Sequence, residues 1–366
     1  MAIAFCISGH GFGHASRQVE VINAFGALRP DQTIHLFTQA SRWLLERTLR
    51  VPVAINEYAV DTGAVQGDSL SMDIPATLSA AAAFEHTADV AAAHLAREFR
   101  RLDVGAVVCD VPAMPFTAAR ASDIPAVALA NFTWDWIYED FTQDHPEYAD
   151  LPRRLADRYA DAGTAWRLPM HGGFATFRTV VEFPWIARRS RRDPAETRRL
   201  LGWDDSRPRV LISFGGYGVS DMRLAHHAGA PYRLVLSAGA GHAPADAPAD
   251  AARVDRDHLD ELQLRYEDLV AACDVVLSKP GYGIVSECVA NDTALLYTER
   301  GRFREYDVMV AQMPQVLRCG HVSNEVMAAG RWDADVAAVL AQPTPVERPL
   351  VNGADVAAGM LSALLD

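Results

Sequence analysis

The sequence has few cysteines, and no two of them stand in a CxxC spacing. The five are an odd number scattered along 366 residues: Cys6, Cys109, Cys273, Cys288 and Cys319. Disulfide scaffolds and structural zinc sites depend on clustered cysteines, so neither is expected. We interpret all five as reduced thiols of a cytoplasmic protein.

Long hydrophobic runs are also missing. No apolar stretch of the sequence approaches the roughly 18 residues of a membrane span. The N-terminal segment MAIAFCISGHG lacks the basic start and the longer apolar stretch of a signal peptide. It is typical of a first β-strand instead.

Positive charge is scarce relative to negative charge. The chain has 34 Lys and Arg against 47 Asp and Glu, a formal net charge of -13. An acidic surface repels the phosphates of nucleic acids and anionic lipids, so neither is an expected partner. A small phosphorylated ligand stays compatible, because a few backbone N–H groups and basic side chains can bind it locally.

What the sequence does contain is a repeated alternation of short apolar runs and helix-like stretches. Half of the residues are hydrophobic, and the length suits two domains of ordinary size. Strands are expected at residues 3–8, 33–38, 104–109 and 125–130, and again at 209–214, 232–237, 274–278 and 294–298. This alternation predicts two doubly wound parallel sheets, the α/β class.

The strand pattern stops in the middle of the chain and then restarts. Residues 132–180 are rich in aromatic and charged side chains without clear strand periodicity, and residues 188–199 contain six arginines, typical of a solvated linker and helix face. We therefore predict an N-terminal domain at residues 1–185 and a C-terminal domain at residues 186–366. The last helix is expected to be able to pack back on the N-terminal domain.

A glycine-rich segment, SGHGFGHASR at residues 8–17, follows the first strand. Glycines there allow a tight turn into a helix N-terminus and a close approach of the backbone to a ligand. The third glycine comes one residue too early for a dinucleotide fingerprint, and no acid ends the second strand. A nicotinamide cofactor is therefore not expected.

Two histidines lie in this segment, and their role is open from sequence alone. The i, i+4 spacing of His10 and His14 could suit zinc, but no third ligand is evident nearby. Both could be loop hydrogen-bonding groups, or one could be a general base, because imidazole titrates near neutral pH. Asp110, at the end of a buried strand, could orient a histidine or simply cap the next helix.

Two further glycine-rich turns follow strands of the second half. SFGGYG at residues 213–218 could present N–H groups to a diphosphate or be an ordinary tight turn. SKPGYGIVSE at residues 278–287 is a strand end, a turn and a helix start, with a lysine in the turn. Glu287, one turn into that helix, could accept hydrogen bonds from both ribose hydroxyls.

Two other clusters have competing interpretations. The aromatic side chains around Asn131, Trp134 and Asp135 could stack on an acceptor ring or belong to core and lid packing. Asp333 and Asp335 form a D-x-D, which helix capping explains better than a metal site.

The combined motifs resemble the GT-B glycosyltransferase superfamily, in particular the branch of the peptidoglycan N-acetylglucosaminyltransferase. They are most similar to the glycosyltransferase-like N-terminal region of plant L-arabinokinases and its stand-alone bacterial relatives. The resemblance rests on SGHGFGHASR, NFTWDWIYEDF, SFGGYG and SKPGYGIVSE and extends from residue 3 to about residue 325. It implies two Rossmann-like domains facing a central cleft.

The resemblance also implies a reaction and its site. The expected activity is metal-independent, inverting transfer of a sugar from a nucleoside-diphosphate donor, UDP-linked, to a small-molecule hydroxyl, with no cofactor. His14 is the implied base and Asp110 its partner. The implied donor-binding residues are Gly215, Gly216, Lys279, Gly281, Tyr282, Gly283, Ser286, Glu287, Arg304, Glu305 and Tyr306. The implied acceptor-binding residues are His10, Gly11, Phe12, Gly13, Asn131, Trp134 and Asp135.

Three points stay open at this level. The segment RFREYD at residues 302–307 departs from the Gln or Asp–Gln pair that the superfamily uses for donor hydroxyls, so the donor sugar is not identified. A sugar-nucleotide hydrolase or 2-epimerase could use the same fold. A non-catalytic sugar-nucleotide-binding module is the other alternative.

Overall fold

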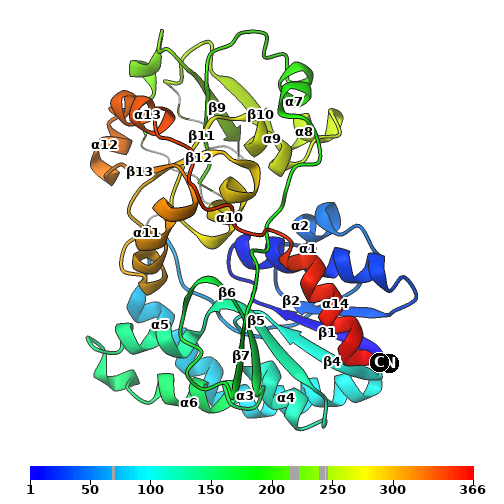
Figure 1. Ribbon diagram of the computed structural model, residues 1–366. Helices are drawn as coiled ribbons and strands as arrows, with labels where there is room; N and C mark the ends of the chain where they lie inside the picture. The colour runs from blue at the N-terminus through cyan, green and yellow to red at the C-terminus, as the bar shows by residue number, and fades with distance from the viewer. Residues whose placement is uncertain (68–70, 215–221, 239–243, 245) are drawn as a thin grey trace.

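The computed structural model describes residues 1–67, 71–214, 222–238, 244 and 246–366 (Figure 1). Gly215 and Gly216, expected in the phosphate loop of the second half, lie outside the described residues. No helix among the described residues is both long and apolar enough to cross a membrane. All five cysteines are free thiols.

The first half of the chain forms a seven-stranded sheet of described strands, all parallel, in the order β3-β2-β1-β4-β5-β6-β7. The strands are β1 (Ala2–Ile7), β2 (Ile34–Thr38), β3 (Ala54–Glu57), β4 (Val104–Cys109), β5 (Ala126–Phe132), β6 (Thr164–Gly172) and β7 (Thr179–Glu182). The helices are α1 (Gly13–Leu28), α2 (Arg42–Thr48), α3 (Ile74–Arg101), α4 (Met114–Arg120), α5 (Trp134–Phe141), η1 (Pro146–Tyr148) and α6 (Leu151–Tyr159). Strand β1 is buried along its whole length, as its continuous apolar run predicts.

The second half repeats the arrangement. Its described strands form a six-stranded parallel sheet in the order β10-β9-β8-β11-β12-β13. They are β8 (Arg209–Ile212), β9 (Arg233–Ala238), β10 (Ala252–Asp255), β11 (Val275–Ser278), β12 (Ala294–Tyr297) and β13 (Cys319–His321). The helices are α7 (Pro194–Leu200), η3 (Ala225–His227), α8 (Arg256–Glu261), α9 (Tyr266–Ala272), α10 (Tyr282–Asn291), α11 (Arg304–Val316), α12 (Asn324–Ala328), α13 (Asp333–Leu340) and α14 (Gly353–Leu365).

The two sheets form two lobes, and the C-terminal helix belongs spatially to the first (Figure 1). Helix α14 lies along α1, and both chain ends lie in the lower lobe. Arg29 at the end of α1 donates hydrogen bonds to Ser362 and Asp366. An isolated antiparallel β-bridge between Ile186 and Asn352 joins the segment that leaves the first lobe to the segment that returns to it.

The structure adds elements that the sequence pattern did not reveal. Strands β3, β6, β7, β10 and β13 were not expected. In β6, buried and half-buried side chains alternate, so its pattern is weaker than the continuous apolar run of a central strand. Helix α1 begins at Gly13, because the glycine turn continues directly into it. His14 therefore lies in the first turn of the helix.

All strands of each sheet run parallel, so their carboxyl ends gather at one edge, where open α/β sheets bind ligands. The two edges meet, and we call this place the junction. It is formed by residues 8–14, Asp110 and Asn131 from the first half and by residues 279–283 and 300–305 from the second.

Candidate functional site at the junction of the two sheets

Two glycine turns, one from each sheet, touch at the junction. A Cβ atom on Gly283 would lie 3.3 Å from the Cα of Gly13. Gly13 opens α1 and Gly283 lies in the first turn of α10, and neither helix has a side-chain cap at its N-terminus. Unpaired N–H groups at helix N-termini favour an anion, and here two such ends converge.

The glycine turn of the first sheet presents His14 to Asp110. Asp110 directly follows β4 and is 1% exposed, and its Oδ2 lies 2.5 Å from Nδ1 of His14. Because a carboxylate only accepts hydrogen bonds, we assign the ring proton to Nδ1, which leaves Nε2 as the proton acceptor. The pair expected from sequence is therefore in contact in the structure.

Arg17 is a third member of this group, and the sequence analysis assigned it no role. Its guanidinium donates to Asp110 and, at 2.7 Å, to Oδ1 of Asn131. Burial alone would raise the pKa of Asp110, but the charges of Arg17 and His14 lower it to about 2. Asp110 is thus held as a carboxylate. The position of Arg17, one turn after His14 in the same helix, was the available signal.

Arg17 also links the two halves of the chain. Its guanidinium lies 4.9 Å from the ring centre of Tyr282, the first residue of α10. Asn131, which accepts from Arg17, donates to Oε1 of Glu305 at 2.6 Å, and Arg300 donates to Oε2 of Glu305 at 2.7 Å. A continuous buried network of hydrogen bonds and ion pairs therefore runs from His14 to Arg300.

His10 differs from His14 in its surroundings. Burial, together with the charges of His14, Arg300 and Lys279, lowers the pKa of His10 to about 3. His10 is therefore neutral at pH 7 and a poor proton acceptor. Arg300 and Lys279 belong to the second half, so positive side chains of that half lie close to this turn.

The expected ribose-binding acid, Glu287, is held by an ion pair. Arg188 donates through Nε to Oε1 of Glu287 at 2.6 Å, and Glu287 is 3% exposed. Burial raises the pKa of Glu287 to about 7, against the lowering by Arg188. Ser286, beside it, donates to the carbonyl oxygen of Gly283 at 2.9 Å and steadies the turn.

The other expected donor residues make contacts between the two halves. Arg304 donates to the carbonyl oxygen of Trp136 at 2.7 Å and to Glu139 at 3.0 Å, both in α5. Glu305 belongs to the network already described. Tyr306 is partly buried against an apolar core that contains residues of both halves. Arg300 lies in the loop that precedes α11, and its guanidinium is beside Gly281.

The aromatic cluster of the first half is buried. Trp134 is 3% exposed and stacks on Tyr138 with ring centres 5.2 Å apart, which matches the packing interpretation of these rings. Burial raises the pKa of Asp135, which is 8% exposed. The Trp134 indole still has a polar role, because Nε1 donates to Asp61 at 3.1 Å.

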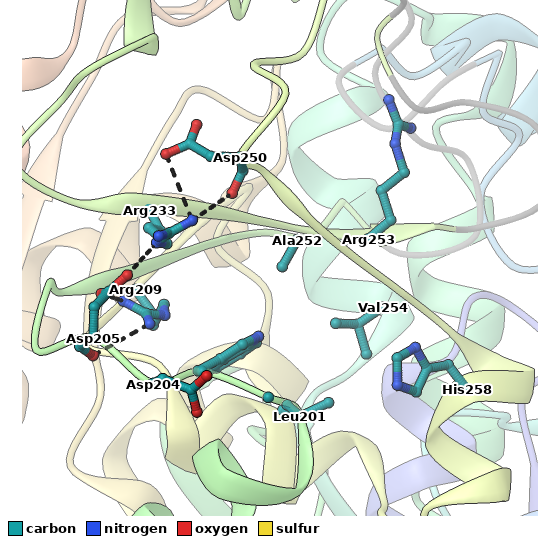
Figure 2. Close-up of a pocket in the computed structure, with 12 residues that line it drawn as sticks. Leu201, Asp204, Asp205, Arg209, Arg233, Asp250, Ala252, Arg253, Val254 and His258 are labelled. Atoms are coloured by element: carbon teal, nitrogen blue, oxygen red, sulfur yellow. Dashed lines mark hydrogen bonds and ion pairs between the residues drawn. The ribbon is translucent and has the colours of Figure 1, made fainter.

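A separate hollow lies at the opposite ends of the strands of the second sheet (Figure 2). Arg209 and Arg233, at the starts of β8 and β9, face Asp205 and Asp250 there. These charges compensate one another. Among the described residues, no group of three or more His, Cys, Asp or Glu side chains is placed to hold a metal ion.

The contact between His10 and the loop after β3 gives a test of the local geometry. Gly63 has φ +62°, and a Cβ there would lie 2.4 Å from Cβ of His10. Gly11 has φ +64° with nothing within 4 Å of such a Cβ. Gly63→Ala should cost about 1–2 kcal/mol of backbone strain plus about 1–3 kcal/mol of overpacking.

Gly11→Ala is the matched control, because it carries the backbone strain without the overlap. The free energy of unfolding of both variants, measured in urea, checks the difference. Equal destabilisation of the two would show that the loop does not pack on His10.

Comparison with known proteins places these features in context. No family model matches the chain. It is 27% identical over 368 residues to a protein named L-arabinokinase from Arabidopsis thaliana, a match that covers 99% of this chain and 34% of that protein. The chain thus spans about a third of the length of this relative, and the resemblance expected from the motifs is confirmed.

Solved glycosyltransferases have the same fold. The glycotransferase of kitacinnamycin matches with a TM-score of 0.62 at 14% identity, covering 100% of this chain and 96% of that one. VinC, solved in complex with dTDP, matches at 0.58 and 14%, covering 100% and 95%. MurG of Acinetobacter baumannii matches at 0.54 and 14%, covering 99% and 100%. The expected GT-B fold is therefore confirmed.

Proposed function

We propose that this chain is a glycosyltransferase that moves a sugar, with inversion and without a metal, from a nucleoside-diphosphate donor to a hydroxyl of a small acceptor. The observation that supports it most is the contact of the glycine turns at Gly13 and Gly283 beside the His14–Asp110 pair. Sugar transfer from a diphosphate needs an anion site and a proton acceptor at one place. The junction supplies candidates for both.

The donor, proposed to be UDP-linked, would place its diphosphate beside the N-termini of α1 and α10, which are in contact. Lys279 and Arg300 add positive charge there, in the role that a metal plays in other enzymes. The contacts of Arg188 with Glu287 go to Oε1. The other oxygen, Oε2, is the atom proposed to accept from a ribose hydroxyl.

The proposed reaction is a single displacement. Nε2 of His14 takes the proton of the acceptor hydroxyl as its oxygen forms a bond to the anomeric carbon. The bond from that carbon to the diphosphate oxygen breaks, and its electron pair leaves with the diphosphate. Asp110 stabilises the imidazolium that forms, and Arg17 holds Asp110 in place.

Binding of sugar nucleotides is the first test. In a thermal-shift screen of UDP, GDP, dTDP and CDP sugars, one class should stabilise the protein by about 2.7 kcal/mol at 100 times its Kd. Lys279→Met should weaken that binding about tenfold or more, as loss of a charged partner does. Product analysis with and without acceptors then separates transfer from hydrolysis.

Arg253→Met is the matched control, because Arg253 is an exposed cation in the hollow of Figure 2. It should leave the binding unchanged. Loss of binding in this variant and not in Lys279→Met would place the nucleotide in the hollow. No binding of any sugar nucleotide would contradict the proposed function.

A further inference from the structure

A second carboxylate, Asp61, reaches the junction from the loop after β3. Its Oδ1 accepts from the hydroxyl of Ser8 at 3.0 Å, and its Oδ2 accepts from Nε1 of Trp134 at 3.1 Å. Ser8 follows β1 directly, and Gly63, two residues after Asp61, packs on His10. Two segments far from Asp61 in sequence, the turn after β1 and the start of α5, therefore hold this carboxylate, while its own loop packs on His10.

Asp61 differs from Asp110 in its partners. Asp110 pairs with Arg17 and His14, whereas both hydrogen-bond donors to Asp61 are neutral, and no ion pair among the described residues includes it. Burial raises the pKa of Asp61 to about 6, although the bonds from Ser8 and Trp134 and the charge of His14 act against the rise. A carboxylate whose pKa is raised by burial and that lies beside a candidate base is typical of a functional position.

The carboxylate has capacity for a further partner. Its two oxygens offer about four acceptor positions, and one hydrogen bond to each oxygen is present. Asp61 is only partly buried. A flat acceptor with a single hydroxyl would remove it from water without supplying a donor, which costs about 1–3 kcal/mol. An acceptor with a second hydroxyl next to the reacting one would supply that donor.

We propose that Asp61 is an acceptor-binding residue, and that the acceptor is a polyol of the sugar class which donates a second hydroxyl to this carboxylate. The inference rests on the proposed glycosyltransferase function and specifies its acceptor. Asp61 binds and orients the acceptor, and His14 remains the proton acceptor.

The test compares acceptors in the full-length chain with the donor found in the nucleotide screen. Free monosaccharides, L-arabinose included, are compared with simple phenols and with an amino alcohol, and the best sugar is then compared with each of its singly deoxygenated forms. We expect sugars to react, and one deoxygenation away from the reacting position to lower kcat/KM at least about tenfold.

Asp61→Asn should raise KM for the parent sugar at least about tenfold, with a much smaller change in kcat and unchanged donor binding. It should also lose the discrimination against the critical deoxygenated form. Asp73→Asn is the matched control, because Asp73 is an exposed carboxylate further along the same connection between β3 and α3. This control should behave as the wild type.

Several outcomes would overturn the inference alone. These are transfer to phenols or to the amino alcohol but not to sugars, equal reaction of every deoxygenated form, or an Asp61→Asn variant with unchanged KM. The deoxygenation series in the wild-type protein decides the matter even if Asp61→Asn does not fold. Failure of the wild type to bind or turn over any sugar nucleotide would overturn the proposed function, and the inference with it.

Discussion

His14→Ala is expected to lower kcat for sugar transfer by about 10²–10⁴-fold, the usual contribution of a general base. Binding of the donor nucleotide should stay roughly unchanged, because the helix N-termini and Lys279 remain in place. Asp110→Asn should also lower kcat strongly, since an amide neither fixes the Nδ1 proton nor stabilises the imidazolium. Steady-state kinetics together with nucleotide binding measure both effects.

His10→Gln is the informative comparison for His14. Burial and nearby positive charges lower the pKa of His10 to about 3, so it is a poor base at pH 7. Its replacement should affect KM for the acceptor more than kcat. If His10→Gln abolished turnover and His14→Ala did not, the two histidines would have exchanged roles, and the proposed mechanism would be wrong.

Arg188→Met is expected to lower the free energy of unfolding by about 3–5 kcal/mol, the usual cost of leaving a buried charge without its partner. Glu287 is 3% exposed, and the Arg188 side chain is 13% exposed. Without Arg188, the desolvation of Glu287 is uncompensated, so its pKa should rise further and the carboxyl should become neutral at pH 7. Urea unfolding measures the loss of stability.

Arg153→Met is the matched control for this prediction. Arg153 pairs with Asp157 at 2.9 Å on a helix surface, with both side chains more than half exposed. Such exposed pairs contribute about 0.3–0.5 kcal/mol. Equal destabilisation by the two substitutions would show that the Arg188–Glu287 pair is not the buried contact described above.

The strands of the candidate site and the residues that directly follow them could be predicted, because a short stretch of sequence is enough to specify each strand. Val104–Cys109 is a continuous apolar run, and the strand has those same bounds in the structure. The acid that follows it lies at the carboxyl edge of a parallel sheet, where a ligand is expected. Strands β6 and β7 were missed because alternating burial and short length make their pattern weak.

The contacts that join the halves could not be predicted in this way. Arg17 lies 93 positions from Asp110, and Asn131 lies 174 positions from Glu305. Which acid an arginine meets at such a separation depends on the order of the strands and on how the two sheets face each other. Glu305 and Arg304 hydrogen-bond to the first half, because helix α11 begins beside α5, and their expected contact with the donor sugar stays a prediction.

The sequence by itself determined the two parallel sheets and the glycine turns after their strands, whereas His14 and Asp110 were singled out as a pair only by the resemblance to glycosyltransferases. Turn chemistry and apolar periodicity act within a few residues, so one chain is enough to detect them. Only the tertiary structure decided that Arg17 pairs with the Asp110 carboxylate, that Arg188 holds Glu287, and that, among the described residues, the hydrogen-bond donors to Asp61 are neutral. The charge state of a buried group depends on its neighbours in space, and the folded arrangement of both sheets sets those neighbours.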